Sequence, residues 1–268
     1  MPLRFRTPMP PRQAWLTLPE TPATSSAPES SESSPFQVEV LWSARARRLT
    51  LRLDPRDGHL RATVPLDTPE LAVRRFLARQ AGWMAARRRR QPQPVPFVPG
   101  AVVPLRGVEH VIRHQPDARR GVHAEPGILT IGGPAAFLAR RLLTWLKAEA
   151  RAALTPRVAA ACARLGVATP AIAVRDPGTR WGSCSVRSGL SFSWRLILAP
   201  EWVLDYVVAH EVAHLREMNH SPRFWAVCAQ LTDDINAPRA WLKTHGARLH
   251  RYGHSQCQDR IPSASPCC

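Results

Sequence analysis

The sequence is poor in several features that mark particular classes of protein. Its six cysteines include no CxxC pair and no regular spacing, which argues against a thiolate zinc knuckle and a secreted disulfide framework. No uninterrupted apolar run approaches the roughly 18 to 20 residues that cross a bilayer, and the N-terminus lacks the apolar core of a signal peptide. We therefore expect a soluble, cytoplasmic protein with no membrane partner.

Acidic residues are also scarce relative to basic ones. The 268 residues include 37 Lys+Arg and 20 Asp+Glu, for a formal net charge of +17. Such a surplus favours a polyanionic partner such as nucleic acid. Only Lys147 and Lys243 are lysines, and the chain is rich in alanine and proline, so a compositional bias toward arginine is the competing explanation. With 44% hydrophobic and 21% charged residues, the chain as a whole is typical of a globular protein.

The first half of the sequence predicts a tail followed by a β-rich region. Residues 1–35 are rich in proline, serine and glutamate, which predicts a disordered tail. Residues 36–133 begin with short segments of alternating polarity, typical of an antiparallel β meander. Thr68 and Pro69 then provide the start signals of one helix, which is expected to run to the four arginines at 87–90.

The second half reads as a mainly helical core. Within residues 134–253 we expect a helix that restarts at Pro156 and closes at Gly166 in the left-handed conformation. A strand follows, and the segment GLSFSWRLIL at 189–198 predicts a second strand with one apolar face. Residues 254–268 are expected to be a flexible tail.

The most informative motif is HExxH, formed by His210, Glu211 and His214. Positions four apart lie on one face of a helix, so both imidazoles can share a metal ion. Glu211 then lies beside the metal, where a carboxylate can act as general base toward a metal-activated water.

A catalytic zinc usually takes three protein ligands, and His220 is the expected third. A continuous helix would turn His220 away from the other two histidines, so the chain must bend back. Asn219 tolerates the left-handed conformation, and Ser221 with Pro222 reads as the N-cap and first residue of a new helix. The sequence therefore predicts a helix break between the second and third ligands.

Four segments together resemble the YgjP-like metallopeptidase family, and more distantly the SprT-like and WLM groups. They are RWGSCS, GLSFSWRLILAP, LDYVVAHEVAHLREMNHSPRFW and WLKTHG, and the resemblance runs from about Phe36 to Tyr252. It implies an α+β fold with a zincin-like core behind a small β-rich N-terminal region, Zn²⁺ on residues matching the three histidines, and Glu211 as general base. Glu217 stands where metzincin-type proteases have glycine. Family members are commonly described as predicted metal-dependent hydrolases, and a nucleotide pyrophosphatase activity has been associated with a relative.

Residues near the motif are candidates for binding substrate. The segment 189–198, with Ser193 and Arg195 on its polar face, is either an edge strand that pairs with an extended substrate or a covered structural strand. Arg180 and Trp181 could place a guanidinium near a carboxylate, phosphate or oxyanion, or could brace the turn.

Two further residues have structural interpretations. Cys184 is interpreted as a packed residue rather than a nucleophile. Asp205 is interpreted as an acid favouring the helix start rather than a partner of a histidine.

The leading hypothesis is a zinc-dependent hydrolase, most plausibly a metallopeptidase acting on a peptide or protein. A metal-dependent nucleotide (UTP-type) pyrophosphatase is the alternative within enzymes, although magnesium prefers carboxylates and water to three imidazoles. The arginines at 87–90 and 119–120 motivate a third hypothesis, a nucleic-acid-associated protease or binding module.

Overall fold

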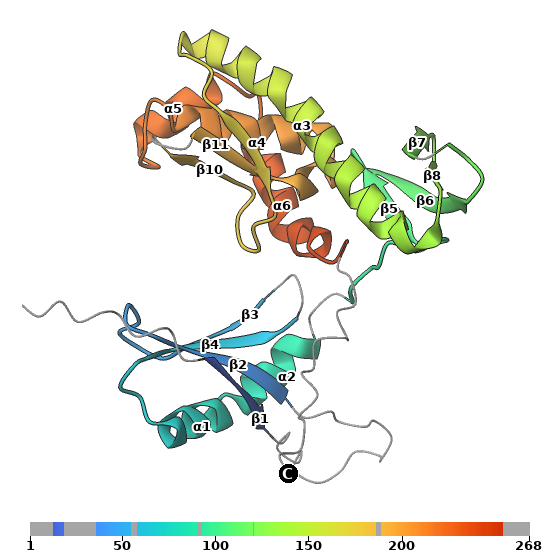
Figure 1. The fold of residues 1–268 in the computed structure, drawn as a ribbon. Coiled ribbons are helices and arrows are strands. Elements are labelled where there is room, and N and C mark those ends of the chain that lie inside the picture. Colours follow the sequence, from blue (N-terminus) through green and yellow to red (C-terminus); the bar gives the residue numbers. More distant parts are fainter. Residues whose placement is uncertain are drawn as a thin grey trace, which may run out of the picture. The chain divides into compact units, whose positions relative to one another are not determined.

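The chain folds into two compact units, Met1–Gln91 and Pro92–Cys268, each with its own hydrophobic core (Figure 1). The computed structural model describes residues 13–18, 36–54, 58–89, 93–119, 121–185 and 189–253. Within these residues the fold combines three small sheets with six α-helices, and the predicted α+β class is confirmed. None of the described helices is long and apolar enough to cross a membrane.

The first unit contains a four-stranded sheet with the order β1-β2-β4-β3. Its strands are β1 (Gln13–Leu18), β2 (Phe36–Ser43), β3 (Thr50–Leu53) and β4 (Leu60–Pro65). Strand β2 pairs with β4 in parallel, and β3 pairs with β4 antiparallel. The predicted antiparallel meander is therefore wrong, because alternating polarity shows which face of a strand is buried but not which strand lies beside it.

Strand β1 lies inside the segment that the sequence analysis assigned to a disordered tail. It pairs antiparallel with β2, and its side chains Leu16 and Leu18 are buried in the core of the first unit. Burial of two leucines and a full row of strand hydrogen bonds offset the entropy lost on ordering six residues. The rest of the predicted tails, 1–12, 19–35 and 254–268, lies outside the described residues.

The single helix predicted for the first unit consists of two helices, α1 (Glu70–Arg79) and α2 (Ala81–Arg89). The break falls at Gln80, whose backbone N–H donates to the carbonyls of Ala78 and Leu77. Both helices bury residues in the same core, so a bend between them keeps two short apolar stripes against one sheet.

The second unit begins with another four-stranded sheet, in the order β5-β6-β8-β7. Its strands are β5 (Val102–Leu105), β6 (Val108–Gln115), β7 (Gly121–Glu125) and β8 (Ile128–Gly132). The contacts of the chain place this sheet in the same unit as the helices that follow it, whereas the sequence pattern changes from strands to long helices near Gly133.

A short 3-10 turn, η1 (Ala135–Phe137), leads into the long helix α3 (Leu138–Leu165). Helix α3 continues through Pro156 instead of restarting there. Leu154 and Val158 on either side of the proline are completely buried, so tertiary packing outweighs the lost backbone hydrogen bond. Gly166 closes the helix with φ 62°, in the left-handed conformation expected from the sequence.

The sheet nearest the HExxH helix has the order β10-β11-β9. Its strands are β9 (Ile172–Arg175), β10 (Gly182–Ser185) and β11 (Gly189–Ser193). The predicted strand 189–198 is thus too long, because Ser193 caps a 3-10 helix, η2 (Trp194–Leu198), by accepting the backbone N–H of Arg195. Strand β11 is also central, paired on both sides, and the edge strands of this sheet are β10 and β9.

Three further helices complete the second unit: α4 (Glu201–Ala213), α5 (Pro222–Ala229) and α6 (Asn236–Leu249). Helix α4, which carries HExxH, packs against α3, α5, α6 and strand β10. Because neighbours surround it on most sides, α4 is apolar around most of its circumference. It is therefore a rigid support for the polar groups at its C-terminal end.

Candidate metal centre

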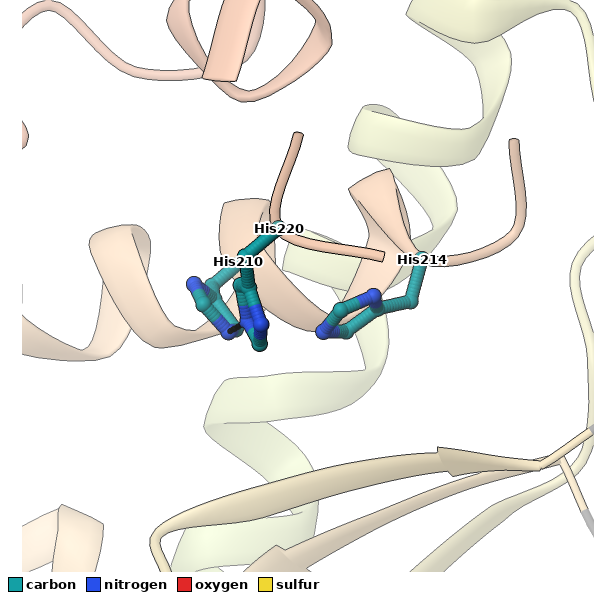
Figure 2. A group of neighbouring side chains, drawn as sticks. All are labelled: His210, His214 and His220. Atoms are coloured by element: carbon teal, nitrogen blue, oxygen red, sulfur yellow. Dashed lines mark hydrogen bonds between the residues drawn. The ribbon is translucent and has the colours of Figure 1, made fainter. Parts of the chain in front are cut away.

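Three imidazoles converge at the C-terminal end of helix α4. His210 lies in its last turn, His214 is its C-cap and His220 follows in the connection to α5. One ring nitrogen from each histidine lies within 4.8 Å of the other two, and His210 Nε2 and His220 Nε2 are 3.0 Å apart. Figure 2 shows the rings pointing toward one another. The structure thus brings together the three residues that the sequence analysis selected as metal ligands.

The chain bends back after α4 as the third ligand requires. Helix α4 ends at Ala213, and the backbone N–H of Glu217 donates to the Ala213 carbonyl at 3.0 Å. Ser221 then caps α5 by accepting the backbone N–H of Phe224 at 3.4 Å. The predicted break is confirmed. Asn219 is not left-handed, since the only positive φ of a described non-glycine residue is at Arg106; successive turn hydrogen bonds reverse the chain instead.

Polar partners orient two of the three rings. His214 donates its Nδ1 hydrogen to the backbone carbonyl of Glu217 at 3.1 Å. The hydroxyl of Tyr206 lies 3.4 Å from His210 Nδ1. Engaging Nδ1 leaves Nε2 free for a metal, and such outer partners fix the ring orientation of metal-binding histidines. Tyr206 was not among the predicted site residues, although it precedes His210 by four residues, the spacing that places two side chains on one helix face.

Burial keeps the helical histidines uncharged. It lowers the pKa of His210 to about 4, with further lowering by His214, His220 and Arg239. Burial also lowers the pKa of His214, against a raising contribution from its hydrogen bond to Glu217. Neutral imidazole is the form that binds a metal, so these rings are ready to act as ligands at neutral pH.

Glu211 is buried between α4 and strand β10, with only 6% of its surface exposed. A Cβ placed on Gly182 would lie 2.5 Å from Glu211 Cγ and Oε1, so the glycine of RWGSCS lets β10 lie directly against the carboxylate. Burial raises the pKa of Glu211 to about 7, and the positive charge of Arg180 opposes the rise. The sequence analysis did not assign a role to Gly182.

The predicted substrate-binding residues fall into two groups. Arg180 is exposed, and its charge acts on Glu211, so it belongs to the surroundings of the site. Trp181 packs on helix α6, with its ring 5.0 Å from the His250 ring and close to Gly246. This contact explains the glycine of WLKTHG, because a side chain there would overlap the indole.

Ser193 and Arg195 face the interior of the second unit, and the structure does not direct them to the histidines. They are 0% and 1% exposed. Arg195 forms an ion pair with Asp176 and donates to the backbone carbonyl of Tyr252 at 3.1 Å. A buried guanidinium needs such partners to offset the cost of its desolvation, so Arg195 has a structural role.

Cys184 and Asp205 have the kinds of environment that suit structural residues. Cys184 packs partly buried against the core, and burial raises the pKa of its thiol, which disfavours the nucleophilic thiolate. Asp205 pairs with Arg157 of helix α3 at 2.8 Å, a partner that the sequence analysis did not foresee.

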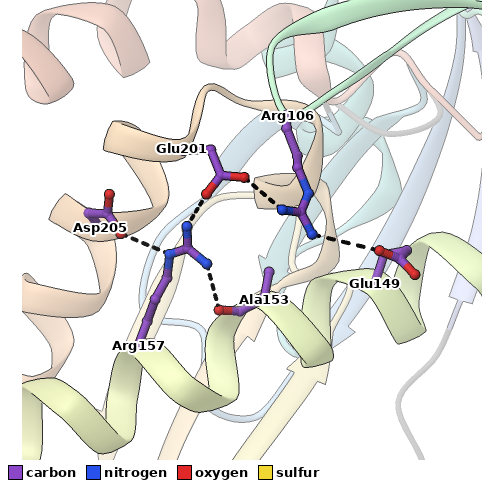
Figure 3. A network of polar contacts seen from close by, with 6 residues as sticks. All are labelled: Arg106, Glu149, Ala153, Arg157, Glu201 and Asp205. Carbon is purple, nitrogen blue, oxygen red and sulfur yellow. Dashed lines mark hydrogen bonds and ion pairs between the residues drawn. The ribbon is translucent and has the colours of Figure 1, made fainter. Parts of the chain in front are cut away.

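A network of charges ties helix α4 to its surroundings. Arg157 contacts both Glu201 and Asp205 at the start of α4. Arg106 also binds Glu201, at 2.8 Å, and lies 3.8 Å from Glu149 of α3 (Figure 3). A network of several ion pairs fixes an element better than one isolated exposed pair. It holds the end of α4 opposite to the histidines.

The donor set fits one group of metals. Three imidazole nitrogens suit zinc and other borderline transition metals, whereas magnesium and calcium select oxygen ligands. Three protein ligands with a neighbouring carboxylate are typical of catalytic zinc, which keeps a fourth position for water or substrate. The residues present could therefore hold zinc.

A helical HExxH motif with a third histidine beyond a chain reversal could hold a metal ion. The family model described as YgjP-like, metallopeptidase domain, matches residues 47–245. The chain belongs to the YgjP-like family, as the sequence resemblance predicted. Comparisons with curated proteins and with solved structures found no match.

Proposed function

We propose that this protein is a zinc-dependent hydrolase that cleaves peptide bonds. His210, His214 and His220 would hold the metal, and Glu211 would act as general base. The observation that carries the proposal is the convergence of three imidazole nitrogens within 4.8 Å next to a buried carboxylate. Bound zinc would supply Lewis-acid polarisation of the substrate carbonyl and would activate water for attack.

Glu211 has the properties of a proton carrier. A base works best when its pKa lies near the working pH, and burial raises the pKa of Glu211 to about 7. Its carboxylate would accept a proton from the attacking water and then donate that proton to the leaving amine. The backbone of Gly182 confines the carboxylate on one side, which restricts its conformations before substrate binds.

The edge position of β10 supports a peptide as substrate. Within the described residues β10 pairs only with β11, so its other side is open to one more strand. An extended peptide can bind such an edge through main-chain hydrogen bonds. Because Gly182 of β10 touches Glu211, a peptide bound there would pass beside the general base.

Hydrolysis of a nucleotide pyrophosphate bond is the second candidate function. The exposed guanidinium of Arg180 near Glu211 favours it, because arginine binds phosphate through paired hydrogen bonds. The all-histidine donor set disfavours it, since magnesium-dependent phosphate chemistry relies on carboxylate ligands.

One experiment separates the two functions. Purified protein loaded with zinc would be assayed against a peptide library and against nucleoside triphosphates. The variants would be Glu211→Gln and, as a matched control, Glu125→Gln at an exposed position of β7. We expect peptide cleavage that falls by about 10²- to 10⁴-fold in Glu211→Gln only. Pyrophosphate release that requires Glu211, without peptide cleavage, would select the second function, and no hydrolysis of either class would refute both.

A further inference from the structure

A polar cavity of about 230 Å³ lies along strand β10. Two arginines, Arg175 and Arg180, and the hydroxyl-bearing Ser183 and Ser191 contribute to its lining. None of the four is a metal ligand, and the proposed chemistry assigns no step to the cavity. Its lining of positive charge and hydroxyl donors is suited to an anion.

Strand pairing explains how the polar groups come together. Ser183 of β10 pairs directly with Ser191 of β11, and directly paired residues project from the same face of a sheet. Arg175 pairs with Ser193, two residues beyond Ser191, and so projects from that face too. The opposite face carries Leu190 and Phe192, which are completely buried in the core.

The two arginines of this cavity differ from the structural arginines of the second unit. Both are exposed, and in the described part of the chain no carboxylate forms an ion pair with either. Arg106, Arg157 and Arg195, in contrast, all bind carboxylates. Two unpaired guanidiniums in one cavity create a local positive potential that an anionic group would neutralise.

The cavity adjoins the reacting centre through Gly182. The backbone of this residue lines the cavity. Its Cβ position faces the other side of the sheet, where Gly182 pairs with Phe192 and lies against the carboxylate of Glu211. An extended chain advances about 3.3 Å per residue. Successive side chains of an extended chain point to opposite faces. A substrate bound along β10 with its reacting bond at Glu211 would therefore direct a group one or two residues away toward the cavity face.

We propose that this cavity binds an anionic group of the substrate, a carboxylate or a phosphate, within about two residues of the hydrolysed bond. The two guanidiniums would neutralise the charge, and the serine hydroxyls would donate hydrogen bonds. This inference deepens the proposed function and rests on it for the identity of the reaction. Anion binding itself can be measured without turnover.

The first test measures binding alone. Inorganic phosphate would be titrated into the protein at constant ionic strength. The protein would be free of zinc, because phosphate would otherwise bind the metal. Arg175→Gln and Arg180→Gln should each weaken binding about tenfold, the usual loss for a hydrogen bond to a charged group. Arg113→Gln, at an exposed position of β6, is the matched control and should bind as the wild type does. Equal phosphate binding in all four proteins would overturn the proposal.

The second test measures turnover by zinc-loaded protein with matched substrates. One pair of peptides would differ by glutamate or glutamine near the cleaved bond, another by a free or amidated C-terminus, and nucleoside triphosphates would test phosphate as the source. We expect a preference for the anionic member, expressed in KM, that disappears in Arg175→Gln and Arg180→Gln. Equal losses for neutral and anionic substrates would indicate a merely structural role and overturn the proposal.

The two tests distinguish failure of the proposed function from failure of the anion-binding proposal. If no substrate is hydrolysed, the proposed function fails, while the phosphate titration still decides whether the cavity binds anions. If hydrolysis occurs without any dependence on substrate charge or on the two arginines, the proposed function stands and the anion cavity is refuted.

Discussion

The buried end of helix α4 and the exposed connection after it contribute to the same metal centre in different ways. His210, Glu211 and His214 are held by a helix packed on most sides, and burial shifts the pKa of each. His220 is exposed and depends on a chain reversal for its position. The helix therefore prepares two ligands and a base, while the connection completes the site.

The largest expected effect is on the stability of the metal-free protein, and it comes from the burial of Glu211. Its pKa is about 7 in the folded state against 4.5 ordinarily, so ionisation destabilises the fold. The destabilisation is absent below pH 4.5, develops as pH rises and is complete above pH 7. Glu211→Gln should therefore raise the free energy of unfolding at pH 8 by on the order of 3 kcal/mol. Denaturant unfolding of the wild type and the variant, in the presence of a chelator at pH 4 and pH 8, measures this change in the free energy of unfolding. An equal difference between the two proteins at both pH values would contradict the prediction.

Removal of the exposed ligand tests the other half of the comparison. His220→Ala should lower zinc affinity by at least about 100-fold, beyond the loss usual for an outer partner of a ligand. The fold should survive because the side chain is exposed. Competition with a chromophoric chelator gives the affinity, with His123→Ala on strand β7 as control. Unchanged zinc binding would exclude His220 as a ligand.

Gly182→Ala should separate catalysis from metal binding. The new methyl would overlap Cγ, Cδ and Oε1 of the buried Glu211 side chain, so the carboxylate must move from its position. Displacing a reacting group by about an ångström can lower the rate by about 100-fold. We expect a fall in kcat of about 10- to 100-fold with unchanged zinc content. If the variant is as active as the wild type, Gly182 does not position Glu211 for catalysis.

The smallest effect is expected from Tyr206→Phe. The substitution keeps the ring that packs near His210 and removes only the hydroxyl 3.4 Å from Nδ1. Loss of such an outer partner typically weakens metal binding by about tenfold or more. The zinc affinity of Tyr206→Phe would be measured in the same assay as that of His220→Ala, so that the two losses can be compared. If Tyr206→Phe binds zinc as tightly as the wild type, the hydroxyl does not orient His210.

Much of the metal centre could be predicted from the sequence because its determinants are local. The spacing of His210 and His214 follows from helix geometry, and the cap at Ser221 with Pro222 marks the next helix. Family resemblance added the expected fold class, and the match over residues 47–245 confirms the family.

Predictions that depended on neighbours distant in the sequence were less accurate. The parallel pairing of β2 with β4 and the uninterrupted course of α3 through Pro156 both differ from the local signals. Arg195 occupies a polar position in an alternating pattern, yet it is buried against Asp176. In each case packing between separate segments outweighs a preference of a few residues.

Backbone propensity and residue spacing act within a few positions along the chain, so they suffice for the HExxH helix, its end after Ala213 and the left-handed Gly166. Burial and strand order depend on which distant segments meet. Only packing in three dimensions makes β10 an edge strand, brings Gly182 against Glu211 and gathers Arg175 and Arg180 around one cavity. The physical reason is that a side chain's solvation and electrostatic surroundings belong to the folded core and not to its sequence neighbours.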